Sequence, residues 1–361
     1  NALRLRKSLK GSSYIGFIGT DHETGDSYNR VVGLDGSFNF AGKYYFNWQA
    51  LGYFTKELND SAIYSNSTAI NSVGNDAGFN GESLSGFGGT FALVRSSRNW
   101  NGEVFLNIAP PEARRELGYM SKNDFRELGM WHGYTIYPHN SVFLRIEPNF
   151  NTGVQYSYDG KIKEQWLVPQ FYIQFKHQIN LSGGYLAINN ENYYDVYHKN
   201  VNRGWLNINI NTSSFVTGGA FYELGKYIVR FEEPSYIGWG FNAEAWMTIK
   251  PINNLVLENN YSYFELSKEK SAEKLYSGYI FRNKTSFQFT RRFFLRLVMQ
   301  YDSFNRSFDI DPLFSYKWNP FTIFYIGSTH NLADIGKSQN HGRFLETQRQ
   351  FFAKFQYLFK M

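Results

Sequence analysis

The sequence has no cysteine, and only 9 of its 361 residues are proline. The absence of cysteine excludes disulfide bonds, zinc sites with thiolate ligands and thiol catalysis. Apolar residues never form an uninterrupted run that approaches the roughly 18 residues of a transmembrane helix. If the chain crosses a membrane, it must do so as a closed β-barrel, because only such a barrel also satisfies every backbone polar group in lipid.

Concentrated positive charge is also lacking. Lys and Arg number 37 against 31 Asp and Glu, but they are scattered along the chain and form no basic run. A nucleic-acid-binding surface needs clustered basic residues, so we expect no nucleic-acid partner. We interpret the charges as belonging to loops and an inner wall, with some facing anionic lipid headgroups.

Aromatic residues are abundant, with 34 Phe, 27 Tyr and 8 Trp making up 19% of the chain. Tyr and Phe favour strands and form the aromatic girdles of membrane barrels. The mean hydropathy of −0.44 indicates that polar residues interrupt the apolar ones at short range. This composition is typical of an amphipathic β protein.

Apolar and polar side chains alternate with period two, as in Lys43–Thr55, Leu275–Thr290 and Phe293–Asp302. These segments are about 10 to 15 residues long, whereas ordinary strands have about five or six and tilted membrane strands about nine to eleven. Their length favours a membrane barrel over a soluble β-sandwich.

The connections between these segments alternate between short and long, as they do in outer-membrane barrels. Tight turns are predicted near Ala41-Gly42, Ser96–Arg98, Pro138–Asn140, Thr212–Ser214, Pro251–Asn254, Arg291 and Asn319-Pro320. Longer loops are predicted at Asp21–Tyr28, Lys56–Gly81, Pro110–Asn123, Phe231–Ser235, Ser267–Lys274 and Ala333–Arg343.

The pattern predicts an all-β fold: a transmembrane antiparallel up-and-down β-barrel of about 18–20 strands, one domain over residues 1–361, in the bacterial outer membrane. Barrels of this class usually have an even number of strands and end on the periplasmic side. Alternation back from the last strand would leave Asn1 outside the cell. We therefore expect at least one earlier strand, and a periplasmic domain before it, to precede residue 1.

The C-terminal segment places Phe355, Tyr357, Phe359 and Met361 on one face, with Lys354 and Gln356 on the other. A final amphipathic strand of this kind resembles the signal that the barrel-assembly machinery recognises during insertion. The alternative is an ordinary edge strand at the end of the chain.

Short motifs spread over nearly the whole chain resemble one known family. They are Leu3–Leu9, Ser12–Gly16, Tyr28–Asp35, Glu116–Tyr119 with Asn123-Asp124, Phe287–Arg296, Gln300–Asp302 and Tyr357–Phe359. The family comprises Bacteroidetes-type outer-membrane β-barrel proteins of unknown function. Its members normally carry an N-terminal domain similar to carbohydrate-binding family nine, and this sequence has no counterpart of that domain.

Motifs for chemistry are few. The run Gly86–Gly89 lies in a strand-like segment, where we interpret it as allowing close packing rather than binding phosphate. Acidic residues around His22 suggest either a cation site or, as we prefer, a solvated turn. We expect no catalytic residues, no metal and no cofactor. Catalytic groups at strand ends can be dispersed in sequence, so an outer-membrane hydrolase remains an alternative.

Ten charged residues oppose apolar neighbours, and we predict that they face the lumen. A charged Arg or Lys facing lipid at mid-bilayer costs about 2–4 kcal/mol, which favours the inward orientation. They either line a water-filled pore or form an internal salt-bridge network. The ten are Glu103, Arg145, Glu147, Lys176, Glu244, Glu258, Arg282, Lys284, Arg292 and Arg296.

The segment Pro110–Met130 is unusually rich in charge. It either folds into the lumen as a constriction or forms an extracellular loop with a helical turn, and we prefer the second interpretation.

Three functions stay open at this point: a channel or transporter for small hydrophilic solutes, including glycan-derived ones; a structural or accessory subunit of an outer-membrane complex; and an outer-membrane hydrolase. The expected partners are outer-membrane lipid and lipopolysaccharide, together with other outer-membrane or periplasmic proteins.

Overall fold

The computed structural model describes residues 1–60, 62, 74–75, 78–270, 273–334 and 344–358. The chain forms antiparallel strands that pair mostly with their neighbours in sequence, in an up-and-down sheet of 21 strands. Two compact units are distinguished and are described separately. Unit 1 contains Asn1–Tyr137, Ile146–Phe171 and Tyr185–Asn202, and unit 2 contains Pro138–Arg145, Tyr172–Gly184 and Arg203–Met361.

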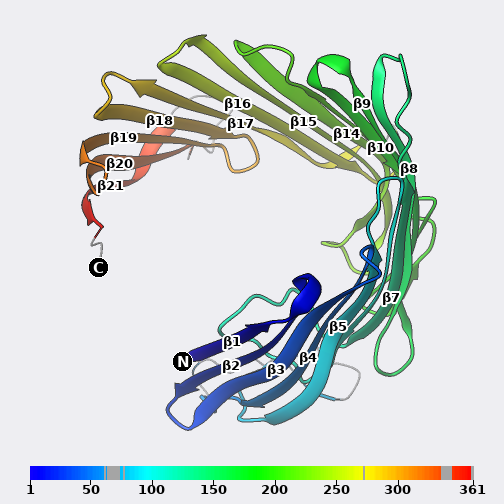
Figure 1. The fold of residues 1–361 in the computed structure, drawn as a ribbon. Helices are drawn as coiled ribbons and strands as arrows, with labels where there is room; N and C mark the ends of the chain where they lie inside the picture. Colours follow the sequence, from blue (N-terminus) through cyan, green and yellow to red (C-terminus); the bar gives the residue numbers. More distant parts are fainter. Residues whose placement is uncertain (61, 63–73, 76–77, 271–272, 335–343, 359–361) are drawn as a thin grey trace. The chain divides into compact units, whose positions relative to one another are not determined.

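In unit 1, long hairpins follow one another along the chain, and β2 to β5 lie side by side (Figure 1). The strands that lie wholly or mostly in this unit are β1 (Ala2–Ser8), β2 (Tyr14–Thr24), β3 (Ser27–Phe40), β4 (Tyr44–Lys56), β5 (Ser83–Arg95), β6 (Trp100–Ala109), β7 (Phe125–Tyr134), β8 (Phe143–Tyr156), β9 (Ile162–Phe175), β11 (Ile188–Tyr193) and β12 (Val196–His198).

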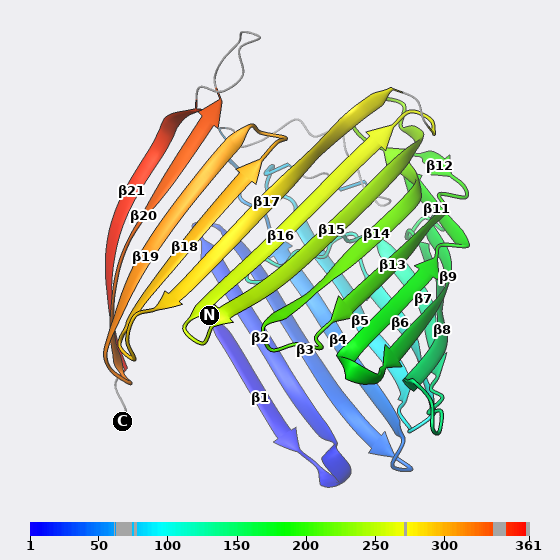
Figure 2. The same ribbon diagram turned by 90° about the horizontal axis from the view of Figure 1, so that it is seen from above.

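Unit 2 repeats this arrangement, and Figure 2 shows β14 to β17 running antiparallel beside one another. Its strands are β10 (Ile179–Tyr185), β13 (Arg203–Ile210), β14 (Val216–Val229), β15 (Tyr236–Ile252), β16 (Leu255–Ser267), β17 (Lys274–Gln288), β18 (Phe293–Asp302), β19 (Ser307–Asn319), β20 (Thr322–Asp334) and β21 (Phe344–Tyr357).

Two crossings are interrupted. Strands β10 and β11 both pair with β9, so they are successive parts of one crossing. Likewise, β12 pairs with β11 and β13 pairs with β10. Counting each of these two pairs once reduces the 21 described strands to 19 crossings, within the predicted range.

Each unit has an apolar face and a polar face. In unit 1, Leu34 and Phe87 are 49% and 75% exposed on the apolar face, while Asp35 is buried on the other. In unit 2, Ile326 and Phe351 are 66% and 71% exposed on the apolar face. Large exposed apolar surfaces of this extent mark contact with lipid or protein, and membrane barrels turn this face to lipid.

The connections follow most of the predictions. Residues Ala41 and Gly42 form a tight turn with positive φ angles of 50° and 67°. The predicted loop Asp21–Tyr28 is wrong, because the pairing of β2 with β3 continues to Thr24 opposite Ser27. Gly25, with φ 60°, lets the chain reverse within this short connection. Most of the predicted loop Ala333–Arg343 lies outside the described residues.

No helix among the described residues is long and apolar enough to cross a membrane.

Candidate functional site

The connection between β6 and β7, Pro110–Asn123, folds over the polar face of unit 1, and we name it the inner loop. Its first residue, Pro110, packs on two glycines of β5, Gly86 and Gly88, which we name the glycine seat. A Cβ on Gly86 would lie 2.9 Å from Cγ of Pro110. A Cβ on Gly88 would lie 2.8 Å from Cδ of Pro110. Because both glycines lack this atom, Pro110 is almost completely buried against the strand. The Gly86–Gly89 run thus allows close packing.

One buried amide fastens the middle of the inner loop. Asn29 on β3 is 1% exposed, and its Nδ2 donates to the Thr55 hydroxyl at 2.9 Å and to the Arg114 carbonyl at 3.2 Å. Its Oδ1 accepts the backbone N–H of Glu116 at 3.2 Å. Both polar atoms of the Asn29 side chain therefore have hydrogen-bond partners in the inner loop or in β4, as buried polar groups generally do.

Apolar packing supports the same placement. Ala113 of the inner loop is 1% exposed within a buried cluster. The Arg115 guanidinium donates to the Tyr53 hydroxyl and lies 5.4 Å from the centre of the Tyr53 ring. The other members of the cluster are Val31 and Leu51, with Ile18 and Met120 packed against it.

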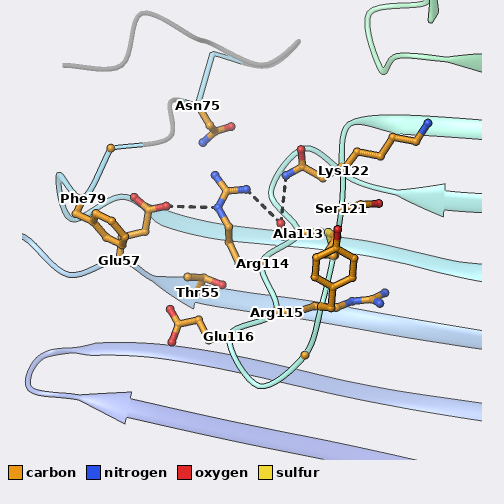
Figure 3. A pocket seen from close by; sticks show the side chains of 15 residues that line it. Thr55, Glu57, Asn75, Phe79, Ala113, Arg114, Arg115, Glu116, Ser121 and Lys122 are labelled. Atoms are coloured by element: carbon orange, nitrogen blue, oxygen red, sulfur yellow. Dashed lines mark hydrogen bonds and ion pairs between the residues drawn. The ribbon is translucent and has the colours of Figure 1, made fainter. Parts of the chain in front are cut away.

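The charges of the inner loop are paired with the wall. Nε of Arg114 lies 3.5 Å from Oε1 of Glu57, and Figure 3 shows Arg114 between Glu57 and the Ala113 carbonyl. Oε2 of Glu116 lies 2.5 Å from Nδ1 of His22 on β2. Nζ of Lys122 reaches Oε1 of Glu164 on β9 at 2.6 Å. The loop therefore spans the polar face from β2 to β9.

A pocket of about 580 Å³ opens beside the inner loop (Figure 3). This volume is in the range of small-molecule sites. Its wall combines β4 with the loop and includes Thr55, Glu57, Arg114, Arg115, Tyr119 and Lys122.

These contacts show that the preferred interpretation of Pro110–Met130, an extracellular loop with a helical turn, was wrong. The loop lies on the polar face and not beyond the strands, and no helical turn is described within it. The hydrogen bonds of Asn29 and the packing of Pro110 on Gly86 and Gly88 hold the backbone in an irregular conformation instead. From Phe125 onward, the segment belongs to β7.

Eight of the ten charged residues predicted to face the lumen lie in strands, on the face opposite exposed apolar side chains. In unit 1, Glu147 is buried and accepts a hydrogen bond from the Thr135 hydroxyl at 2.5 Å. In unit 2, Glu258 and Lys284 occupy paired positions and form an ion pair at 2.6 Å. The other five are Glu103 in unit 1 and Arg145, Glu244, Arg282 and Arg296 in unit 2.

The remaining two of the ten residues, Lys176 and Arg292, lie outside the strands. Lys176 is exposed in the short 3-10 turn Lys176–Gln178 (η2), where His177 has a φ of 61°. Arg292 is exposed in the turn before β18. In both places the alternation of apolar and polar residues continues past the end of the strand, so this pattern alone did not show where the strand ends.

Sequence reasoning missed an ion pair between an exposed Arg4 and a buried Asp35. Arg4 on β1 reaches across β2 to Asp35 on β3, and its Nη2 lies 2.7 Å from Oδ2. A Cβ on Gly16 of β2 would lie 2.8 Å from Oδ1 of Asp35, so the pair needs glycine there. The alternating Arg4 was visible in the sequence, but its partner is 31 residues away.

The suggested cation site around His22 is not assembled. Asp21 and Glu23 pair with Arg30, whereas His22 on the alternate face contacts Glu116. Across the part of the chain that the structure describes, no group of three or more His, Asp or Glu residues could hold a metal ion.

The C-terminal strand β21 exposes Phe351, Phe355 and Tyr357, the last two at 59% and 51%. Phe359 and Met361, the other predicted members of the assembly signal, lie outside the described residues. Its role as an assembly signal stays a prediction.

No family model and no curated protein match the sequence. The resemblance to the Bacteroidetes-type family therefore stays a prediction.

Solved structures are similar in fold. A variant of the ferric enterobactin receptor PfeA from Pseudomonas aeruginosa has a TM-score of 0.57 at 9% identity, covering 98% of this chain and 69% of that chain. The siderophore receptor PirA from Acinetobacter baumannii has a TM-score of 0.55 at 8% identity, covering 98% and 69%. The ferric citrate transporter FecA in its unliganded form has a TM-score of 0.54 at 9% identity, covering 100% and 68%. This likeness confirms the predicted outer-membrane β-barrel fold, which agrees with the predicted location in the bacterial outer membrane.

Proposed function

We propose that this protein is a selective channel or transporter for small hydrophilic solutes in the outer membrane. The observation that carries the proposal is the inner loop, which packs on the polar face of unit 1 beside a pocket of about 580 Å³. In membrane β-barrels, the polar face lines the lumen. A loop bound there narrows the passage and places its side chains beside any solute that crosses.

The charges around the pocket favour solutes without a large net charge. The wall includes three basic residues, Arg114, Arg115 and Lys122, and the acidic residues Glu57 and Glu116. Arg114 and Lys122 already have carboxylate partners. Because neither sign dominates, the passage is not expected to concentrate ions of one charge. The receptors and transporters of similar fold support a transport role in general terms.

The test is electrical conductance in planar lipid bilayers. We compare the wild-type protein with a variant in which residues 112–122 are replaced by a short Gly-Ser linker. The variant is expected to show larger single-channel conductance, because the obstruction is removed while Pro110 and Pro111 stay on their seat. Absence of conductance in both proteins, with normal folding, would contradict a channel.

A second candidate function is an accessory subunit of an outer-membrane complex, and one feature of unit 2 favours it. On the apolar face, Nδ2 of Asn283 donates to Oδ1 of Asn259 at 2.8 Å, and the Thr285 hydroxyl donates to Asn283 at 2.9 Å. Exposed Tyr261 and Phe281 flank this row. Polar groups are costly against lipid, so such a row is better accommodated by a protein partner.

Mild-detergent extraction from native membranes tests this second function. Replacing Asn259 and Asn283 by Leu is expected to release a bound envelope protein while the barrel itself stays folded. The matched control is Asn260→Leu, on the opposite face of the same strand. A solitary protein in the wild-type extract would argue against an accessory role.

A further inference from the structure

A second cavity, of about 400 Å³, lies on the polar face of unit 1, and the ion pair between Lys122 and Glu164 joins its wall to the inner loop. Its walls come from β7, β8, β9 and the segment around β11. The lining includes Glu127, Asn151, Glu164, Trp166, Gln170 and Asn189. The cavity thus combines one large aromatic side chain with carboxylates, carboxamides and the apolar Val168 and Leu186, and none of the described lining residues is basic.

Trp166 is held in one orientation. Its ring covers Gly153 on β8, where a Cβ would lie only 2.3 Å from Cζ2 of the indole. Its Nε1 donates to Oδ1 of Asn151 at 2.5 Å. The glycine and the acceptor hold the indole against the backbone of the neighbouring strand. Trp166 also lines the cavity, where these contacts make it a fixed platform.

The polar groups around this platform are also positioned in advance. Glu127 accepts hydrogen bonds from the side-chain amides of Asn107, at 2.9 Å, and Gln155, at 2.7 Å. Glu164 is held by Lys122 of the inner loop. A carboxylate has about four acceptor positions, so each retains capacity for a ligand hydroxyl.

We propose that this cavity is a carbohydrate subsite that takes one neutral pyranose ring. The ring's C–H face stacks on Trp166, because the negative face of an aromatic ring attracts polarised C–H groups. Hydroxyls donate to Glu127 and Glu164 and exchange hydrogen bonds with the carboxamides of Gln170 and Asn189. Two carboxylates and no basic residue in the wall disfavour phosphorylated or acidic sugars. This inference rests on the proposed transport of small hydrophilic solutes and names their class.

Trp131 provides a matched control. Its ring also covers a glycine, Gly133, with Cζ2 at 2.9 Å from the position of a Cβ. Its Nε1 donates to Asn149 at 3.3 Å. The local arrangement is the same, but Trp131 does not line the cavity.

The experiment measures binding of maltose, cellobiose and N,N′-diacetylchitobiose to the full chain in detergent, by calorimetry and saturation-transfer NMR. At least one of these is expected to bind. Trp166→Ala should weaken its binding about tenfold, in keeping with the loss of one aromatic contact. Trp166→Phe should retain part of the affinity, and Trp131→Ala should leave it unchanged.

Three results would overturn the subsite: no binding of any of these sugars at millimolar concentration, equal losses in Trp131→Ala and Trp166→Ala, or tighter binding of tetramethylammonium than of every sugar. The last result would identify a cation–π site instead. Binding in detergent requires no flux, so this test is separate from that of the channel. A protein that conducts but binds no sugar refutes only the subsite, and one that binds sugar without conducting refutes only the channel.

Discussion

At the scale of single residues, glycines decide where other groups can lie on the polar face. Gly88 illustrates this most sharply, because a Cβ there would lie 2.5 Å from the Ile108 carbonyl oxygen and 2.8 Å from Pro110. Gly153 gives Trp166 its place in the same way. At these two positions the glycine therefore marks a contact made by another segment.

Gly88→Val is expected to displace the start of the inner loop. Overpacking of this kind typically costs about 1–3 kcal/mol, and the unfolding temperature in detergent should fall accordingly. Gly118→Ala, within the loop itself, is the control, because a Cβ there meets only one atom, at 4.0 Å. Equal stability of the two variants would argue against the glycine seat.

The turn between β8 and β9 should depend on pH. The hydroxyl of Ser157 donates to Asp159 and, with Lys161, holds the pKa of that carboxyl below its usual value. Since the folded-state pKa is depressed, the contact stabilises the turn above the unfolded pKa and is lost as pH falls through the folded one. A carboxyl NMR titration should place the Asp159 midpoint below that of an ordinary aspartate, and Ser157→Ala should raise it. An unchanged midpoint in that variant would remove the hydroxyl as the cause.

At the scale of elements, the inner loop is held by separate groups along its length. Proline packing fixes its start, Asn29 its middle and Lys122 its far end. This distributed anchoring predicts that the loop stays on the polar face of unit 1.

The absence of cysteine makes this placement testable by crosslinking. Val31 and Ala113 belong to one buried cluster, so the double substitution Val31→Cys/Ala113→Cys should form a disulfide under mild oxidation. Mass spectrometry of a digest of protein in native membranes reads out the bond. Pairing Ala113→Cys with Val32→Cys, on the apolar face, is the control that should stay reduced.

The strands were predictable from the sequence because a bilayer imposes one period on every crossing. The alternation around Glu258 and Arg282 identified the polar face without knowledge of neighbours. The ends of the strands were harder to predict, as Lys176 and Arg292 show. The alternation of apolar and polar residues can continue into a turn, so it does not reveal where the backbone reverses. Contacts such as Asn29 with the Arg114 carbonyl depend on residues 85 positions apart, and no local pattern reports such pairing.

At the scale of the whole molecule, insertion should depend on the C-terminal strand. Deleting residues 355–361 is expected to abolish membrane yield, because the aromatic face that begins at Phe351 would lose its terminal part. Quantitative immunoblotting of outer-membrane fractions measures this yield. Gln356→Ala, on the polar face of the strand, should insert normally; unimpaired insertion of the truncated chain would exclude an assembly signal here.

The Arg4–Asp35 pair has a consequence for how the chain is fastened at its first strand. Backbone hydrogen bonds join β1 to β2 and β2 to β3, whereas the guanidinium passes through the gap above Gly16 and ties the outer two together. Separation of β1 from the sheet would then break both its backbone hydrogen bonds to β2 and the Arg4–Asp35 ion pair. A single methyl group at Gly16 would occupy the space that the guanidinium needs, and β1 would then be attached only by its backbone hydrogen bonds to β2.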